Sequence, residues 1–359
     1  MRAVVYDAPR RFTVTEVPLP EPGPRDVRVR VLQTGVCGTD LHLHEGRFMA
    51  AYPMVPGHET VGVVDALGSG LGGEPRGAPG GGPGGSPMDQ DVPRVGERVV
   101  VNPNASCGHC AYCREGRSLL CDALTGVGSN LPGAFAEYVV APASQVFSAE
   151  GLDVDTAVFA EPTSCAAHGI DVIAPRHGST ALVFGAGPTG LLLAQLLRAA
   201  GASHVTVAAP TAFKLELATA LGADSTYRMD RGNLAGDVRS LRDLSGGSGY
   251  DVVVDATGAA RVAEVLVPLT RNGGTAVFYG VTDEEDLVAV SPYDVFRREL
   301  TIKGSFAEIS SFPAALAALR AGRARTDGMI THRFPLDRYG EALEALRSDA
   351  TAHKVVVVP

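Results

Sequence analysis

Lysine is nearly absent from this 359-residue chain, which carries it only at Lys214, Lys303 and Lys354. We attribute this scarcity to a coding bias without functional content. The net formal charge is -9 and no basic stripe is present, which excludes a nucleic-acid partner. The chain lacks an apolar run of about twenty residues, so we expect no membrane-spanning helix. No apolar segment follows a basic start, so we expect no signal peptide and a cytoplasmic location.

Cysteine is scarce but clustered. Four of the six cysteines lie within residues 107–121. In a long chain without an export signal, such a cluster indicates metal ligands rather than disulfides. The length favours about two domains, each large enough to bury its own core.

Three residues of the types that Zn²⁺ accepts lie far apart in the chain. Cys37 begins the segment Cys-Gly-Thr-Asp-Leu-His, His58 lies in Gly-His-Glu-Thr-Val-Gly, and Glu161 precedes Pro162. A thiolate, an imidazole and a carboxylate with one open position suit a catalytic zinc ion. We therefore predict that Cys37, His58 and Glu161 hold such an ion. In isolation, these three residues would favour the simpler interpretation of a buried cysteine, a turn histidine and a capping glutamate, and the rest of the chain reverses this preference.

Three further polar residues lie beside these candidate ligands. Thr39 offers a hydroxyl, and His42 can pass a proton to water at neutral pH, so we predict a proton relay. The alternative is that Thr39 caps a helix and His42 lies on its exposed face. Glu59 is predicted to tune the metal or to bind it transiently, or else to form a structural salt bridge.

The four clustered cysteines follow the spacing Cys-x2-Cys-x2-Cys-x7-Cys. This pattern suits a closed tetrahedral structural zinc site, which would stabilise a loop of low apolar content. An iron–sulfur cluster begins with the same spacing, but the long last gap and the absence of proline after the fourth cysteine disfavour it. A redox dithiol is the weakest alternative. The predicted ligands are Cys107, Cys110, Cys113 and Cys121.

Glycine, proline and serine dominate residues 68–91. Such a composition cannot bury a core, so we expect a flexible surface insertion, mainly over 72–91. A lid over the active site is the alternative.

A nucleotide-binding pattern begins near residue 180. The apolar run 180–184 predicts a buried parallel strand, and a helical pattern follows residue 190. Between them stands Gly-x-Gly-x-x-Gly, which lets a helix N-terminus approach a pyrophosphate. A later strand and turn over 250–258 adds a further candidate contact. The predicted cofactor residues here are Gly185, Gly187, Pro188, Thr189, Gly190 and Thr257.

The residue at the end of the second strand of this pattern indicates whether the chain prefers NAD or NADP. An acidic residue there would bind the ribose 2′-hydroxyl of NAD, but Ala209 occupies this position. A 2′-phosphate would therefore not be repelled, and Thr211 and Lys214 could contact it. We predict NADP in preference to NAD. The alternative is that Lys214 only lies on an exposed helix face.

The pattern along the chain predicts an α/β protein with two domains. Alternating strands and helices over 156–289 predict a doubly wound parallel sheet of the Rossmann type. Strand-like spacing with turns over 1–155, including a cysteine lobe at 102–125, predicts a β-rich catalytic domain. Two amphipathic helices, near 310–321 and 338–348, and a final strand suggest that the chain returns to this domain from residue 290 onward.

Taken in order, these motifs resemble those of the zinc-containing medium-chain alcohol dehydrogenases over nearly the whole chain. The resemblance rests on residues 37–42, 57–62 with Gly68, the four cysteines, Glu161-Pro162, Gly185–Gly190 and the closing 354–356. It implies a GroES-like catalytic domain with a Rossmann domain, two zinc ions, and a dimer or tetramer. Glu161-Pro162 followed by His168 is most similar to the polyol (sorbitol or arabinitol) dehydrogenase branch. Leu71 and Ala209 depart from the family pattern, and the second departure puts NAD use in doubt.

The resemblance implies a zinc-dependent hydride transfer between a polyol–ketose pair and NADP(H). Two other functions remain open from the sequence. One is a dehydrogenase acting on an aldose, an amino alcohol or a simple alcohol. The other is a zinc- and nucleotide-binding protein without catalysis, which the three intact candidate ligands disfavour.

Overall fold

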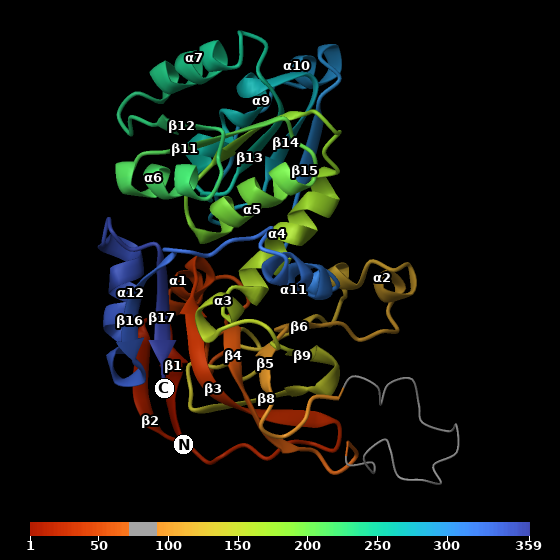
Figure 1. Ribbon diagram of the computed structural model, residues 1–359, viewed down its shortest axis with the longest axis vertical. Coiled ribbons are helices and arrows are strands. Elements are labelled where there is room, and N and C mark those ends of the chain that lie inside the picture. The colour runs from red at the N-terminus through yellow and green to blue at the C-terminus, as the bar shows by residue number, and fades with distance from the viewer. Residues whose placement is uncertain (72–91) are drawn as a thin grey trace. The chain divides into compact units, whose positions relative to one another are not determined.

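The computed structural model describes residues 1–71 and 92–359. The insertion predicted at 72–91 lies outside the described residues. Contacts divide the chain into two compact units, which Figure 1 colours by residue number. The first comprises Met1–Glu161 and Ile330–Pro359, and the second comprises Pro162–Met329. In the part of the chain described, no helix is long and apolar enough to cross a membrane.

A seven-stranded sheet forms the frame of the first unit, in the order β16-β17-β3-β4-β5-β9, with β8 also paired to β3. Its strands are β3 (Asp26–Val36), β4 (Glu59–Leu67), β5 (Arg98–Val101), β8 (Tyr138–Pro142), β9 (Val146–Ser148), β16 (Ile330–Pro335) and β17 (Lys354–Val358). Two small sheets join β1 (Arg2–Ala8) to β2 (Arg11–Glu16), and β6 (Asn104–Ala105) to β7 (Thr125–Gly126). The unit's helices are α1 (Gly38–His44), α2 (Ala111–Arg114), α3 (Val154–Ala157) and α12 (Tyr339–Ser348), with 3-10 turns η2 (Ser118–Leu120), η3 (Ala143–Gln145) and η4 (Leu336–Arg338).

The core of this unit follows from the alternation in β3. Val27, Val29 and Val31 are buried, and the arginines between them point to the other face. β-branched side chains pack well on a pleated surface, and these three valines pack against Val64 and Val99. This packing fixes the register of β3 against β4, so that the end of β3 lies beside the start of β4.

The second unit contains a six-stranded sheet, all of whose neighbouring strands pair in parallel, in the order β12-β11-β10-β13-β14-β15. Its strands are β10 (Thr180–Phe184), β11 (His204–Ala209), β12 (Ser225–Arg228), β13 (Tyr250–Asp255), β14 (Thr270–Phe278) and β15 (Thr301–Gly304). Numbered from β10, the order is 3-2-1-4-5-6, that of a Rossmann dinucleotide-binding fold, in which ligands bind where the order reverses. That place is the pair of strand ends at β10 and β13. The predicted fold class is confirmed.

Helices cover both faces of this sheet (Figure 1). Leu182 and Phe184 pack with Leu241 of α7 (Leu234–Leu244) and with Leu266 and Leu269 of α9 (Leu266–Leu269) on one face. On the other face, α5 (Pro188–Ala199) buries an unbroken run of residues from Gly190 to Leu197. The helices are α4 (Ala160–Ile173), α5 (Pro188–Ala199), α6 (Ala212–Ala220), α7 (Leu234–Leu244), α8 (Ala260–Ala263), α9 (Leu266–Leu269), α10 (Pro292–Arg297) and α11 (Phe312–Arg320).

The second domain boundary differs from the prediction. We expected a return to the first domain at residue 290, whereas the contacts place it at Ile330. The reason is β15, which extends the parallel sheet by pairing with β14. Lys303 of β15 also donates hydrogen bonds to the carbonyls of Val172 and Ile173, at 2.7 and 3.2 Å, and so caps the end of α4. The two predicted amphipathic helices are present as α11 and α12.

Candidate functional site

Cys37, His58 and Glu59 form a group in which one ligand atom of each lies within 4.8 Å of the others. Cys37 stands between the end of β3 and the first residue of α1, and His58 directly precedes β4. Because Gly35 pairs with Glu59, the end of β3 lies beside the start of β4, and Cys37 and His58 are brought together there. The sequence prediction that Cys37 and His58 come together agrees with this geometry.

A buried carboxylate beneath the group was not predicted. Asp40 is 1% exposed, accepts a hydrogen bond from the Cys37 amide at 2.9 Å, and lies 3.6 Å from His58 Nδ1. Burial raises the pKa of Asp40 to about 6, against the opposing charge of His58. Burial alone would lower the pKa of His58, but Asp40, Cys37 and Glu161 together raise it well above its usual value. A carboxylate that holds an imidazole is the usual support of a metal-binding histidine.

A second buried charge pair lies beside the first. Lys354 and Glu59 form an ion pair, and both residues are buried, with relative exposures of 2% for Lys354 and 1% for Glu59. Burial alone would lower the pKa of Lys354, yet the negative charges of Glu59, Cys37 and Glu161 raise it above its ordinary value. Strand β17 brings the lysine here, since Val355 pairs with Val36 next to Cys37.

Glu161 is the second residue of α4 and is 9% exposed. Its charge raises the pKa values of both His58 and Lys354. Among the described residues, however, the close group with Cys37 and His58 contains Glu59 rather than Glu161. The assignment of Glu161 as third ligand and of Glu59 as a supporting carboxylate therefore stays a prediction.

The chemistry of this donor set fits a zinc ion. One thiol, one imidazole and several carboxylates lie close together here, next to the ammonium group of Lys354. Zn²⁺ is bound by these three ligand types, and a dication would offset the excess negative charge that raises the pKa of His58.

The two residues predicted to relay a proton lie on α1. The Cys37 thiol lies 3.7 Å from Thr39 Oγ1, so the threonine hydroxyl adjoins the candidate metal ligand. His42 follows three residues later, which places it on the same side of the helix. His44, which has no predicted role, instead shares a 2.8 Å hydrogen bond with the hydroxyl of Tyr6.

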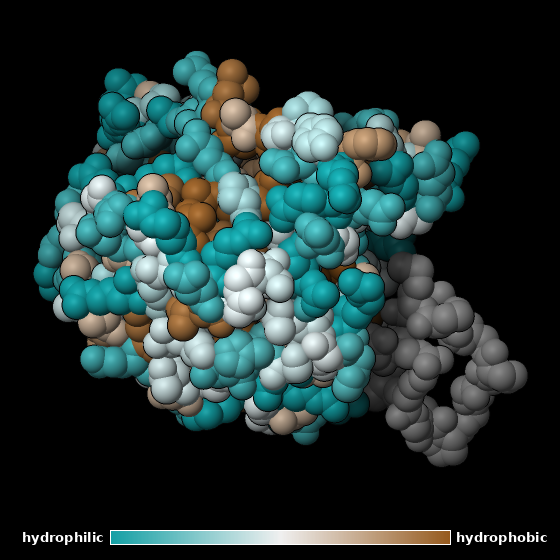
Figure 2. All heavy atoms as spheres, turned by 90° about the horizontal axis from the view of Figure 1, so that it is seen from above, coloured by the Kyte–Doolittle hydropathy of each residue, from teal (hydrophilic) through white to brown (hydrophobic). Residues whose placement is uncertain are grey.

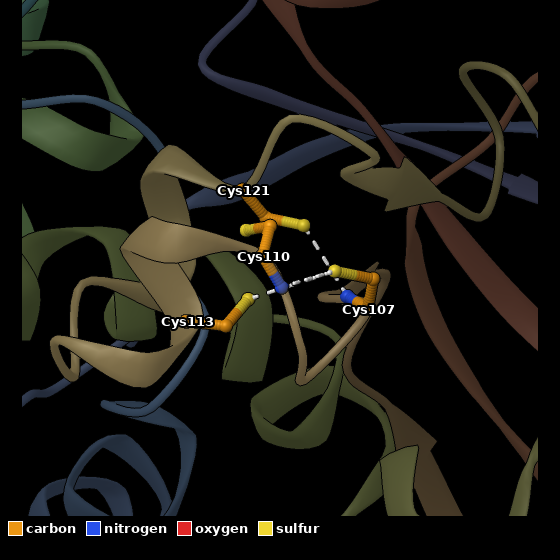
Figure 3. A group of neighbouring side chains, drawn as sticks. All are labelled: Cys107, Cys110, Cys113 and Cys121. Atoms are coloured by element: carbon orange, nitrogen blue, oxygen red, sulfur yellow. Dashed lines mark hydrogen bonds between the residues drawn. The ribbon is translucent and has the colours of Figure 1, made fainter.

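The four clustered cysteines form the second group whose ligand atoms lie within 4.8 Å of one another (Figure 3). Backbone amides support them: the Cys107 amide donates to Cys121 Sγ at 3.2 Å, and the Cys110 amide donates to Cys107 Sγ at 3.3 Å. Hydrogen bonds from backbone amides lower the pKa of Cys110 to about 6, whereas burial raises that of Cys113 to about 11. All four are free thiols, and four thiolates leave no open position for chemistry.

The glycines after β10 bring the strand end close to its neighbours. Gly185 has a φ of 106°, and a Cβ there would lie 3.0 Å from the Ala256 carbonyl and 3.1 Å from Thr257 Cγ2. A Cβ on Gly190 would collide with the carbonyl of Gly185, whereas one on Gly187 would meet no atom within 4 Å. The space before Gly187, at the N-terminus of α5, therefore fits a pyrophosphate.

Hydrogen bonds to Asp255 hold Thr257 in place after the end of β13. Thr257 donates to Asp255 Oδ1 through its amide, at 2.8 Å, and through its hydroxyl, at 2.6 Å. Pro188 and Thr189 open α5 at its first turn, where proline is favourable. The predicted cofactor residues at both strand ends therefore meet where the strand order reverses.

The predicted 2′-group contacts lie along the start of α6. Ala209 is the last residue of β11 and is 3% exposed, Thr211 is the N-cap residue of α6, and Lys214 lies in its first turn. A helix N-terminus favours negative charge. The preference for NADP over NAD stays a prediction.

Sequence reasoning missed Asp40, Lys354 and Asp255 as parts of the site. Each left a signal. Asp40 is the third residue after Cys37, the position that completes a capping box. Lys354 is a rare lysine placed directly before four valines of a buried strand. Asp255 ends a hydrophobic strand just before a Thr-Gly turn.

Comparison with known proteins agrees with this geometry. Residues 23–151 match the family model of the alcohol dehydrogenase GroES-like domain, and residues 188–321 match that of the zinc-binding dehydrogenases. The chain is 38% identical to D-arabinitol dehydrogenase 1 of Uromyces fabae, covering 97% of this chain and 94% of that protein. It is 33% identical to D-altritol 5-dehydrogenase of Agrobacterium fabrum, covering 99% and 98%. A crystal structure of a zinc-binding dehydrogenase from Sinorhizobium meliloti 1021 bound to NADP superposes with a TM-score of 0.87 at 34% identity, covering 100% and 99%.

Proposed function

The chain belongs to the zinc-containing medium-chain alcohol dehydrogenases, and on that premise we propose that it oxidises a sugar alcohol to its ketose. The hydride is transferred to NADP, and the reverse reaction uses NADPH. The proposal depends mainly on the close group of Cys37, His58 and Glu59, which is supported by the buried carboxylate of Asp40. The names of the two relatives, which act on arabinitol and altritol, support a polyol substrate.

Each residue near Cys37 has a distinct role in this proposal. Cys37, His58 and Glu161 hold a zinc ion, with Glu59 beside them. When bound, the zinc ion supplies Lewis-acid stabilisation of charge on the substrate oxygen, and the nicotinamide accepts the hydride. Asp40 orients His58, and Lys354 neutralises Glu59.

The proton of the reacting hydroxyl leaves through the protein. The Thr39 hydroxyl lies next to Cys37 and is placed to accept this proton while passing its own to His42. His42, on the partly exposed side of α1, exchanges it with water. A histidine suits this exchange because its ordinary pKa lies near neutrality.

The cofactor is NADP in this proposal, held by the turn Gly185–Gly190 and by Thr257. Thr211 and Lys214 bind the 2′-phosphate. A second zinc ion occupies the cysteine lobe, where Cys107, Cys110, Cys113 and Cys121 hold it for stability alone.

We further propose that two copies associate through the edge of the parallel sheet. β15 is the last strand of that sheet. Large hydrophobic side chains are exposed in residues 281–306, among them Leu287 at 90%, Tyr293 at 69% and Phe296 at 80%. Figure 2 shows hydrophobic groups between hydrophilic ones on the face seen from above. An unpaired edge strand beside apolar side chains suits pairing with a second copy.

The test of the proposed function is a set of initial rates with NADP and with NAD, measured against pentitols, hexitols, aldoses and amino alcohols on protein of known zinc content. Turnover of a pentitol or hexitol with NADP supports the proposal. Turnover of only aldoses or amino alcohols, in protein with two zinc ions per chain, would overturn the polyol assignment and retain the dehydrogenase.

A further inference from the structure

Two residues at neighbouring strand ends lie side by side in the second unit. Ala209 ends β11, Arg228 ends β12, and the two pair in register. One residue further on, the Met229 amide donates to the Ala209 carbonyl at 3.0 Å. Because side chains alternate between the two faces of a sheet, residues that pair across parallel strands project to the same face. Arg228 therefore projects to the face on which Ala209 replaces the expected carboxylate.

The backbone that carries Arg228 is held on both sides. Tyr227, on the opposite face, packs against the core, and its hydroxyl donates to Asp237 at 2.9 Å. The amide of Asp230 donates to the same carboxylate at 3.0 Å. The buried Asp237 thus fixes the chain before and after Arg228, and only the arginine side chain remains free to adjust.

The guanidinium of Arg228 is exposed and lacks a partner. Over residues 1–71 and 92–359, no hydrogen bond, ion pair or ring contact reaches its side chain. Two arginines of the first unit's sheet, by contrast, pair with carboxylates: Arg28 with Asp65 at 2.7 Å and Arg333 with Asp155 at 2.5 Å. An arginine offers five donors in a planar fork, which matches phosphate geometry.

We propose that Arg228 binds the 2′-phosphate of NADP and so determines cofactor specificity from the third strand of the nucleotide domain. The inference rests on the proposed NADP preference, and it adds a residue outside the α6 segment that holds Thr211 and Lys214. An aspartate at position 209 would bind the ribose 2′-hydroxyl and would pair with Arg228. Ala209 leaves the guanidinium available for a phosphate instead.

The test compares wild-type zinc-loaded protein with Arg228→Ala by isothermal titration calorimetry, using 2′,5′-ADP and 5′-ADP as probes. Loss of a charge-assisted hydrogen bond weakens binding by about ten- to hundred-fold. We expect a weakening of that size for 2′,5′-ADP and no change for 5′-ADP. In kinetics, KM for NADP should rise while KM for NAD and kcat stay unchanged. Arg239→Ala, on the exposed side of α7, is the matched control and should behave as wild type.

The outcomes separate this inference from the proposed function. Equal weakening of both probes would mean that the substitution disturbs the fold, which overturns a specific role for Arg228. Unchanged binding of 2′,5′-ADP to the variant, with wild type still preferring that probe, overturns the inference alone. A wild type that prefers 5′-ADP overturns the NADP proposal, and this inference falls with it. Arg228→Lys should restore part of the affinity, since a point charge replaces the bidentate fork.

Discussion

Lys354 and Glu59 form their ion pair across the intervening strand β3, over Gly35. Each is the first residue of its own strand, and each is almost fully buried. A Cβ at Gly35 would lie 2.8 Å from Lys354 Cε, so only glycine leaves room for the pair. The arrangement places one fixed positive charge behind the candidate zinc ligands.

The first prediction concerns this lysine. Lys354→Met removes the partner of a buried carboxylate, and the uncompensated charge should lower the free energy of unfolding by about 3–5 kcal/mol. Urea denaturation at fixed zinc content measures the loss. Lys354→Met combined with Glu59→Gln should recover most of it, because no buried charge is then left unpaired. A single variant as stable as wild type would show that the pair contributes nothing.

The second prediction separates the two carboxylates near Cys37 and His58. Glu161→Ala should remove or weaken one zinc ion per chain while leaving the fold intact, because it deletes a direct ligand. Glu59→Gln should retain two zinc ions. Zinc per chain by atomic absorption, with circular dichroism as the check on folding, reports both. The reverse result would make Glu59 the ligand, as the close group in the structure allows.

A third prediction concerns the cofactor. Ala209→Asp places a carboxylate where NAD-binding chains use one to hold the ribose, and it repels a 2′-phosphate. The ratio of kcat/KM for NADP to that for NAD should fall by about ten-fold or more, since a lost charge-assisted contact costs about that factor. Ala209→Asn, which has the same shape without the charge, is the control. An unchanged ratio in the aspartate variant would place recognition of the 2′-group elsewhere.

The fourth prediction concerns assembly. Phe296 is 80% exposed and Ile302 lies on the edge strand. Burying one such side chain contributes about 1.5–3 kcal/mol, so Phe296→Glu combined with Ile302→Arg should convert a dimer into monomers. Light scattering after size-exclusion chromatography gives the mass. Leu244→Glu, at an exposed leucine of α7, serves as the control. A double variant that keeps the dimer mass would rule out this edge as the interface.

The sequence predicted the parts of the fold whose signals are local. The strand, glycine turn and helix at 180–197 could be recognised because periodicity and glycine spacing lie within one short segment. The boundary at residue 330 could not, because it depends on the parallel pairing of β15 with β14, and a short strand such as Thr301–Gly304 has no pattern of its own.

The candidate site shows the same division. Cys37 and His58 were predictable because their residue types already indicate metal binding. The pairing of Lys354 with Glu59 was not, because it depends on the register of β17 and β4 on either side of β3. A cofactor contact from Arg228 could not be predicted either, because it depends on the pairing of Arg228 with Ala209 across β11 and β12.

The three lysines have a practical consequence for chemical labelling. Lys354 is buried in an ion pair, and Lys303 donates to two carbonyls at the end of α4. Lys214, which is partly exposed in the first turn of α6, should therefore react with an amine-reactive dye more than the other two lysines. In the proposed function this lysine contacts the 2′-phosphate, so NADP should protect it from the dye. Mass spectrometry of the dye on this peptide would then follow cofactor binding without any assay of turnover.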